Sequence, residues 1–236
     1  MKTKRLYGIL FALMLLCVAV TAVFLLLLPD RVPVHWNFAG QADRIGSKYE
    51  NLIWPFFALG MGGAFLLIAR HEGKKNGENN EKIMLLAAII TLLTFTVLGV
   101  VFMGKGLKYD PAAENPVSVD DVGRFINICV GVLLAAIGNF LPKVRRNGFI
   151  GLRVKWSMVS DAVWQRSQRF CGISGVIAGL VLILSALILR GAWNLAALMG
   201  VMAVWLILNL WAARRYWLED RERRAAGGGE EGGSDP

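Results

Sequence analysis

Long apolar stretches alternate with short polar segments along nearly the whole chain. Six of the apolar stretches are long enough to cross a bilayer core of about 30 Å, which takes roughly 20 helical residues. They cover residues 6–28, 51–69, 83–103, 124–141, 172–189 and 194–213. Because only helices or closed barrels satisfy the backbone in lipid, the pattern predicts an all-α integral membrane fold with six transmembrane helices.

Composition agrees with this class, since 56% of the 236 residues are hydrophobic. That fraction is typical of a polytopic membrane protein. The first stretch follows Lys2, Lys4 and Arg5, as a secretory signal would. Its apolar run of 23 residues exceeds the apolar core of a signal peptide, and no small-residue cleavage site follows. We interpret it as a retained anchor.

Basic residues are divided unequally between alternate loops. With the N-terminus inside, nineteen Lys and Arg fall on inner segments and six on outer ones, while Arg124 lies at a boundary. Cytoplasmic loops carry the excess of Lys and Arg, so both termini are expected in the cytoplasm. The net charge of +9 then reflects topology and contact with anionic lipid headgroups. Direct binding of nucleic acid is not expected, because the charge is spread over separate loops.

The stretches and loops divide the chain into four units. Residues 70–82 are rich in Gly and Asn and predict a solvated inner turn. Residues 227–236 have nothing to bury and predict a disordered end. The units are an N-terminal two-span unit with an outer loop (1–69), a third span with flanking loops (70–121), a C-terminal three-span unit with a basic inner loop (122–213), and a basic, then disordered, cytoplasmic tail (214–236).

The interiors of the six stretches contain no Asp, Glu, Lys, Arg or His. Ion-coupled transporters need such groups near the middle of the membrane, so this class has no support here. Gly175 and Gly179 form a G-x-x-x-G step that predicts close helix packing within the protomer, with dimerisation as the alternative. Four polar residues are expected to bond neighbouring helices: Asn127, Ser174, Ser185 and Asn209.

Cys17, Cys129 and Cys171 fall within or beside the apolar stretches. Their odd number and their spacing predict neither a disulfide framework nor a metal site, and no cofactor is expected. The two histidines, His35 and His71, are expected on opposite sides of the membrane, which excludes a site built from several histidines.

The outer loop at residues 29–48 is the first candidate site. Val32, Val34 and Trp36 alternate with polar residues and Pro, which predicts a short extended segment ending at a turn through Gly40. His35 and two further polar residues of this loop are candidates to converge on a polar ligand. Two interpretations remain: a hydrogen-bonded cap that orders the loop, and a recognition surface for something arriving from outside.

The inner loop at residues 139–172 is the second candidate site. It carries seven Lys or Arg against a single acid, Asp161. Lys143, Arg145 and Arg146 follow the fourth stretch and are expected at the phosphate layer. From Ser157 the pattern turns helical and amphipathic, which predicts an interfacial helix before the fifth span. The loop is interpreted either as a lipid anchor or as a docking face for a cytosolic protein.

Both loops resemble the SdpI-type family of bacterial membrane proteins. The outer pattern P-x-H-x-N-x-x-G-x-x-D-x-x-x-x-K is present in full, as Pro33, His35, Asn37, Gly40, Asp43 and Lys48. The two patterns and the six-span layout together cover most of the chain. The pairing of the two patterns is more specific than either one alone.

The inner loop is similar to the family's second signature, with departures. Val154 and Lys155 stand where the family usually has Thr-Pro, and Gln168 stands where His is usual. Asp161 takes the place of a common Glu. The matching residues are Gly138, Asn139, Pro142, Lys143, Arg145, Asn147, Gly151, Arg153, Trp156, Trp164, Arg169 and Gly172.

The resemblance implies a multi-pass protein of the bacterial cytoplasmic membrane that protects the cell from a secreted hydrophobic peptide toxin without catalysis. It also implies signalling, by holding a cytosolic transcriptional repressor at the membrane. The outer pattern is then expected to meet the toxin. The inner signature, with Arg146 and Asp161, is expected to dock the partner. A transporter of a small solute or lipid and a membrane-embedded enzyme remain as alternatives.

Overall fold

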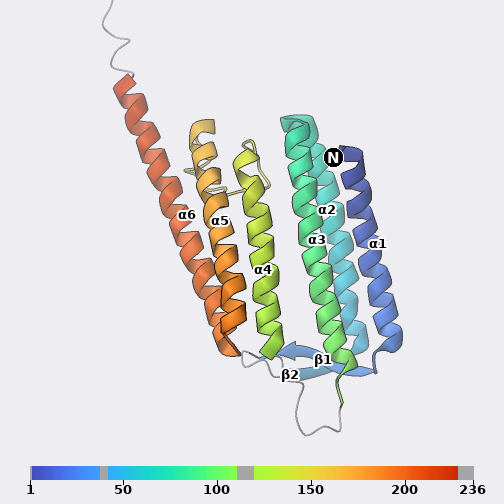
Figure 1. Ribbon diagram of the computed structural model, residues 1–236. Helices are drawn as coiled ribbons and strands as arrows, with labels where there is room; N and C mark the ends of the chain where they lie inside the picture. The colour runs from blue at the N-terminus through green and yellow to red at the C-terminus, as the bar shows by residue number, and fades with distance from the viewer. Residues whose placement is uncertain (1, 38–41, 111–119, 228–236) are drawn as a thin grey trace, which may run out of the picture.

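The computed structural model describes residues 2–37, 42–110 and 120–227. Within these residues the chain forms six long helices and one two-stranded hairpin (Figure 1). All six helices are long and apolar enough to cross a membrane, which confirms the predicted helical membrane fold. They are α1 (Thr3–Leu27), α2 (Ile53–Asn76), α3 (Glu78–Leu107), α4 (Asp120–Phe140), α5 (Asp161–Ile188) and α6 (Ala192–Gly227).

The helices form two groups of three, α1–α3 and α4–α6 (Figure 1). Leu6, Leu10, Leu85 and Leu92 lie in the core of the first group and are almost fully buried. The principal helix contact between the groups is that of α3 with α4, and it is smaller than every helix contact inside the groups except that of α4 with α6. The two groups are therefore packed more tightly within themselves than against each other.

The most extensive contact between any two described helices joins α4 to α5. A Cβ atom added at Gly179 would overlap the carbonyl oxygen of Gly131, and one at Gly172 would overlap that of Gly138. The two backbones therefore touch at two levels, which only residues without a side chain permit. Gly175 faces Trp205 of α6. The G-x-x-x-G step accordingly packs within the protomer, as predicted.

The hairpin lies at the end of the bundle opposite the N-terminus (Figure 1). β1 (Arg31–Trp36) pairs antiparallel with β2 (Ala42–Ser47), and η1 (Lys48–Leu52) then leads into α2. Val32 is buried against Leu28 and Met103, which anchors β1 to the ends of α1 and α3. The predicted extended segment is confirmed, and β2 is an additional strand. The predicted turn at Gly40 lies outside the described residues.

The inner end of the bundle differs from the prediction in two places. Only Gly77 separates α2 from α3. Most residues of the predicted solvated turn are exposed, among them Lys74, Lys75 and Asn79, but Glu72 and Asn80 on either side of Gly77 are buried. The segment from Arg214 to Ala226, predicted as a basic tail, is helical. It continues α6, whose 36 residues span about 54 Å and so exceed the bilayer core. Residues 228–236 lie outside the described residues.

The predicted interfacial helix is also replaced by a different arrangement. The hydroxyl of Ser160 accepts a hydrogen bond from the N–H of Val163 at 3.2 Å and caps α5, which then runs unbroken into the membrane span. Val163 and Trp164 are buried, and Trp164 packs on Val144 and Ile83. The apolar side chains of Val163 and Trp164 therefore face protein. An amphipathic pattern alone does not tell whether an apolar helix face packs on protein or on lipid.

Candidate functional site

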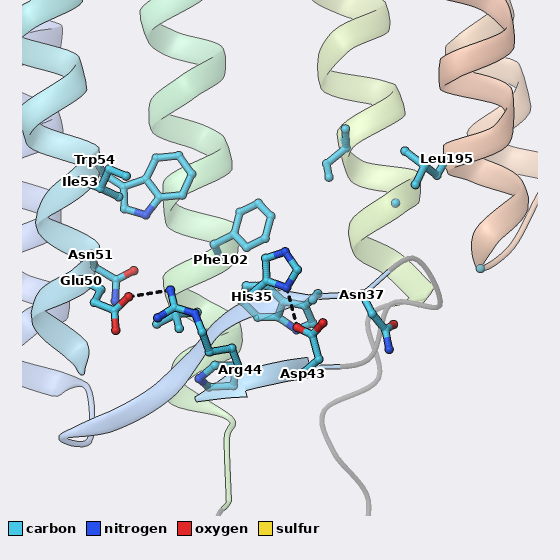
Figure 2. A pocket seen from close by; sticks show the side chains of 16 residues that line it. His35, Asn37, Asp43, Arg44, Glu50, Asn51, Ile53, Trp54, Phe102 and Leu195 are labelled. Carbon is cyan, nitrogen blue, oxygen red and sulfur yellow. Dashed lines mark hydrogen bonds and ion pairs between the residues drawn. The ribbon is translucent and has the colours of Figure 1, made fainter. Parts of the chain in front are cut away.

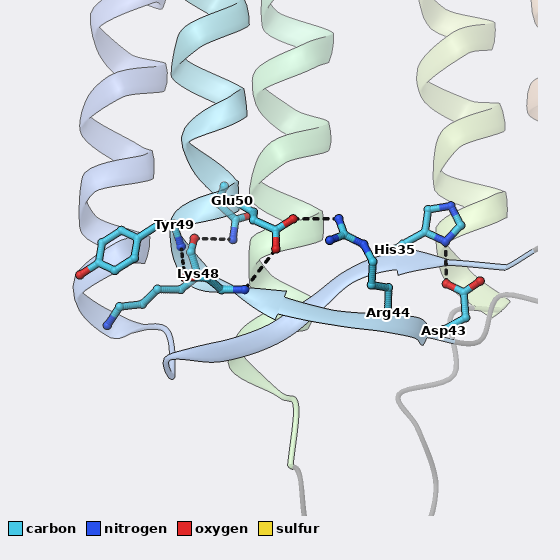
Figure 3. A network of polar contacts seen from close by, with 8 residues as sticks. His35, Asp43, Arg44, Lys48, Tyr49 and Glu50 are labelled. Carbon is cyan, nitrogen blue, oxygen red and sulfur yellow. Dashed lines mark hydrogen bonds and ion pairs between the residues drawn. The ribbon is translucent and has the colours of Figure 1, made fainter.

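Two ion pairs order the outer hairpin (Figure 3). Nδ1 of His35 lies 2.6 Å from Oδ1 of Asp43, and Nη2 of Arg44 lies 2.8 Å from Oε2 of Glu50. The other oxygen of Glu50 accepts the N–H of Ser47 at 3.2 Å, which completes a capping box at the start of η1. The strands and the start of α2 are thereby held in one fixed arrangement.

The hairpin covers a cavity of about 620 Å³ between the outer ends of the helices (Figure 2). Trp54 on α2 and Phe102 on α3 line one side, and Ile126 on α4 and Leu195 on α6 line the other. The volume falls within the range of roughly 300–1,000 Å³ that is common for ligand sites. The cavity is therefore formed jointly by the two groups of helices.

Aromatic rings form the apolar wall of this cavity. The ring centroids of Trp36 and Phe102 are 5.0 Å apart, and those of Trp54 and Phe102 are 5.9 Å apart. Nε1 of Trp36 is buried, and among the described residues it has no hydrogen-bond partner. A buried donor without an acceptor costs about 1–3 kcal/mol. The indole N–H is thus enclosed by the protein, and a molecule in the cavity does not reach it in this arrangement.

Four of the six residues of the predicted outer site line this cavity, and one, Lys48, lies away from it. Lys48 faces away, since its ammonium lies 3.0 Å from Asp30 and 3.5 Å from the carbonyl oxygen of Leu28, at the junction of α1 and the hairpin. Gly40 lies outside the described residues. The predicted residues that line the cavity are Pro33, His35, Asn37 and Asp43.

At the opposite end, Asn147 builds the inner loop. Its side-chain carbonyl accepts the N–H groups of Phe149 at 2.7 Å and Ile150 at 2.9 Å. Its amide group donates to the carbonyl of Arg145 at 2.8 Å. Asn147 is only 5% exposed. The Asn147 side chain thus supplies the hydrogen bonds that hold this tight turn, in place of the backbone hydrogen bonds of a helix or strand.

The α2–α3 junction fastens this loop to the first group of helices. The buried side-chain carbonyl of Asn80 accepts the N–H of Arg145 at 3.0 Å, and its amide donates to Glu72 at 3.2 Å. Asn79 donates to the carbonyl of Lys143 at 3.0 Å. The sequence analysis missed these three residues. The only signal was the unusual run of Asn and Glu in residues 72–81, which also fits a solvated turn.

Trp164 and Gln168 fasten the loop to α5. The indole N–H of Trp164 donates to the carbonyl of Val144 at 2.8 Å. Gln168 accepts the N–H of Leu152 at 2.9 Å and donates to the carbonyl of the same residue at 3.1 Å. Gly151 beside it has a φ of 105°, which favours glycine, and a Cβ there would meet Gln168. Gln168 therefore positions the loop backbone.

The side chains of the inner signature fall into two groups: those with a contact to another part of the protein and those that are exposed. Arg146 donates to the carbonyl of Met158 at 2.9 Å and pairs with Asp161 at 2.9 Å. Arg153 donates to the carbonyl of Gly148. Trp156 is half-buried beside the Lys155 ammonium. Pro142 lies where a side chain at Gly172 would meet it. The remaining signature positions with exposed side chains are Asn139, Lys143, Arg145 and Arg169.

Neither end of the bundle resembles a metal centre. Across residues 2–37, 42–110 and 120–227, no group of three or more His, Cys, Asp or Glu side chains is placed to hold a metal ion. Cys17, Cys129 and Cys171 are buried free thiols. The geometry at both ends suits binding: a partly apolar cavity lies at the hairpin end, and a basic loop held by hydrogen bonds lies at the opposite end.

Comparisons with known proteins match both ends of the chain. Residues 12–59 match a domain of unknown function, DUF1648, and residues 143–211 match the SdpI/YfhL protein family. The chain is 22% identical over 190 residues to Immunity protein SdpI of Bacillus subtilis (strain 168), which covers 80% of this chain and 85% of that protein. No solved structure matches the chain. The matched regions contain the hairpin and most of the inner loop.

Proposed function

Because the chain belongs to the SdpI-type family of membrane proteins, we propose that it is an immunity protein that protects a bacterial cell from a secreted hydrophobic peptide toxin. It acts in the cytoplasmic membrane as a multi-pass binding protein and carries out no catalysis. Its outer hairpin meets the toxin, in the orientation that the distribution of Lys and Arg predicts. The similarity to an immunity protein over 80% of the chain supports this role.

The observation that carries the toxin-binding role is the pair of His35 and Asp43 at the cavity. Their side chains are 62% and 42% exposed, respectively. A pair this exposed contributes at most about 1 kcal/mol to folding. A role in folding therefore explains little of why two polar side chains are held 2.6 Å apart beside an aromatic pocket. Contact with an incoming peptide accounts for the arrangement better.

The inner loop supports a second, separable part of the proposal. Exposed cations such as Lys143 and Arg145 project from a loop that Asn80, Asn147 and Trp164 hold in place. A fixed loop with exposed cations suits an acidic surface of a cytosolic protein and the anionic lipid headgroups beside it. We include docking of a transcriptional repressor here as part of the same proposal.

No observation favours transport as a second function. Several polar side chains within the described spans are bonded to the protein: Thr96 donates to the carbonyl of Leu92 at 2.8 Å, and Asn209 donates to Ser174 at 3.2 Å. Such bonds are typical of contacts within and between helices.

Survival of toxin-treated cells tests the proposal. A bacterium that lacks its own immunity protein is challenged with the family's toxin peptide while it expresses this chain or a variant at equal membrane levels. We expect the wild type to protect and His35→Ala to lose protection, while Arg31→Ala, an exposed change on the same strand, keeps it. Arg153→Ala should keep protection and lose recruitment of the repressor. Failure of a well-expressed wild type to protect would refute the immunity role.

A further inference from the structure

The outer cavity joins two surfaces of different character. One side is an aromatic wall from the hairpin, α2 and α3, and the other consists of aliphatic side chains from α4 and α6. The edge carries the two ion pairs of the hairpin (Figure 2). An apolar interior with a few placed polar groups is the usual composition of a site for an organic ligand.

We propose that this cavity is the toxin-binding site, and that it receives an uncharged, apolar segment of the peptide. Apolar side chains of the segment fill the space between Phe102 and Leu195. This assignment rests on the proposed immunity function and specifies its recognition site.

The charges at the cavity favour a neutral segment over an anionic lipid headgroup. The guanidinium of Arg44 is held by Glu50 at 2.8 Å, and the imidazole of His35 by Asp43 at 2.6 Å. Each basic group at the edge is thus matched by a carboxylate. A phosphate would have to compete with these carboxylates, whereas an uncharged peptide leaves both pairs intact.

The volume limits how much of a peptide enters. About 620 Å³ is the size of a pocket for a drug-sized ligand, so only a few side chains fit. The rest of the peptide then lies over the exposed face of the hairpin. Affinity accordingly depends on a short apolar stretch of the toxin as well as on contacts with the strand residues.

A cavity-filling variant tests the assignment by function. Leu195→Trp places a large ring in the cavity, and Leu206→Trp makes the same change at an exposed position of the same helix. We expect Leu195→Trp to lower the tolerated toxin concentration by about tenfold or more, because the ring excludes the peptide. Leu206→Trp should behave as the wild type. Ile126→Phe fills the cavity from α4 and provides a second, independent variant if Leu195→Trp fails to reach the membrane.

Chemical protection tests occupancy directly. In a variant whose three cysteines are replaced by alanine, Leu195→Cys is labelled with a membrane-impermeant maleimide on intact cells. The toxin peptide should slow this labelling several-fold and leave Lys108→Cys, an exposed position outside the cavity, unchanged. Peptide analogues with the apolar stretch replaced by serine should give no protection.

The outcomes separate the two proposals. The cavity assignment would be overturned, and the immunity role would stand, if the wild type and both cavity-filling variants protect fully and the toxin leaves the labelling of Leu195→Cys unaltered. Absence of wild-type protection would remove the immunity role itself. Slow labelling of Leu195→Cys without toxin in cells, but fast labelling in detergent, would identify a membrane lipid as the occupant and also overturn the assignment.

Discussion

The side chain of Asn80 lies within hydrogen-bond distance of both backbone polar groups of Arg145, the N–H and the carbonyl. It accepts the N–H of Arg145 at 3.0 Å, and its amide lies 3.4 Å from the carbonyl of the same residue. Asn80 belongs to the first turn of α3, whereas Arg145 follows α4. One buried side chain therefore attaches the basic inner loop to the other group of helices.

Replacement of Asn80 by alanine should loosen the inner loop. Asn80→Ala leaves the N–H of Arg145 and the carboxylate of Glu72 each without one partner, at a cost of about 1–3 kcal/mol. We expect a lower midpoint of thermal unfolding in detergent and faster amide hydrogen exchange at Arg145. Asn79→Ala removes one exposed bond and serves as the control. Equal effects of the two changes would contradict the role of Asn80 in holding the backbone of Arg145.

The contact between α4 and α5 should not tolerate a methyl group. In Gly179→Ala the new Cβ overlaps the carbonyl of Gly131, so the helices must separate, at a cost of about 1–3 kcal/mol. Gly200→Ala on α6 meets no atom within 4 Å and should be neutral or slightly stabilising, because alanine favours helix. Thermal unfolding of the two variants in the same detergent measures the difference. A Gly179→Ala protein as stable as the wild type would exclude a tight contact.

Loss of the His35–Asp43 pair should affect stability very little. Both side chains are exposed, so His35→Ala is expected to change the free energy of unfolding by less than about 1 kcal/mol. Trp164→Ala, in the buried inner core, should cost about 3–5 kcal/mol. Denaturation monitored by circular dichroism compares them. A large loss of stability in His35→Ala would assign the pair to folding and weaken its role in recognition.

Labelling from outside the cell should reveal the orientation of the bundle. With the native cysteines replaced, Arg31→Cys lies at the hairpin end and Val159→Cys at the inner-loop end, and both positions are exposed. We expect a membrane-impermeant maleimide to modify Arg31→Cys on intact cells. Val159→Cys should react only after the membrane is permeabilised, because the distribution of Lys and Arg predicts that the basic loops face the cytoplasm. The reverse pattern would invert the predicted topology.

The sequence was sufficient for the helices because span length and apolar content are local properties. The alternation of Val32, Val34 and Trp36 likewise predicted β1. It was not sufficient for β2, whose six residues include one large apolar side chain, Ile45. That strand forms because β1, already anchored through Val32, presents its backbone to it. The local pattern for β2 is too weak to predict a strand.

The inner junction could not be predicted for a different reason. Glu72 and Asn80 occur in a run that suits a solvated turn, and they are buried only because the backbone of Arg145 folds onto them. The cavity likewise depends on Phe102 and Leu195, which are far apart in sequence. The two loop patterns lie at opposite ends of the bundle, and the roles predicted for them stay predictions. They gave no information about which side chains meet there.

The double glycine contact makes α4 and α5 behave as a single rod. Backbones that touch at two levels can neither slide nor rotate past each other without overlap, and packed interfaces do not deform gradually. Ile126 borders the outer cavity, and Pro142 begins the inner loop, about 24 Å further along the same rod. A displacement of α4 at Ile126 would therefore be carried along the helix pair to the inner-loop end of the bundle.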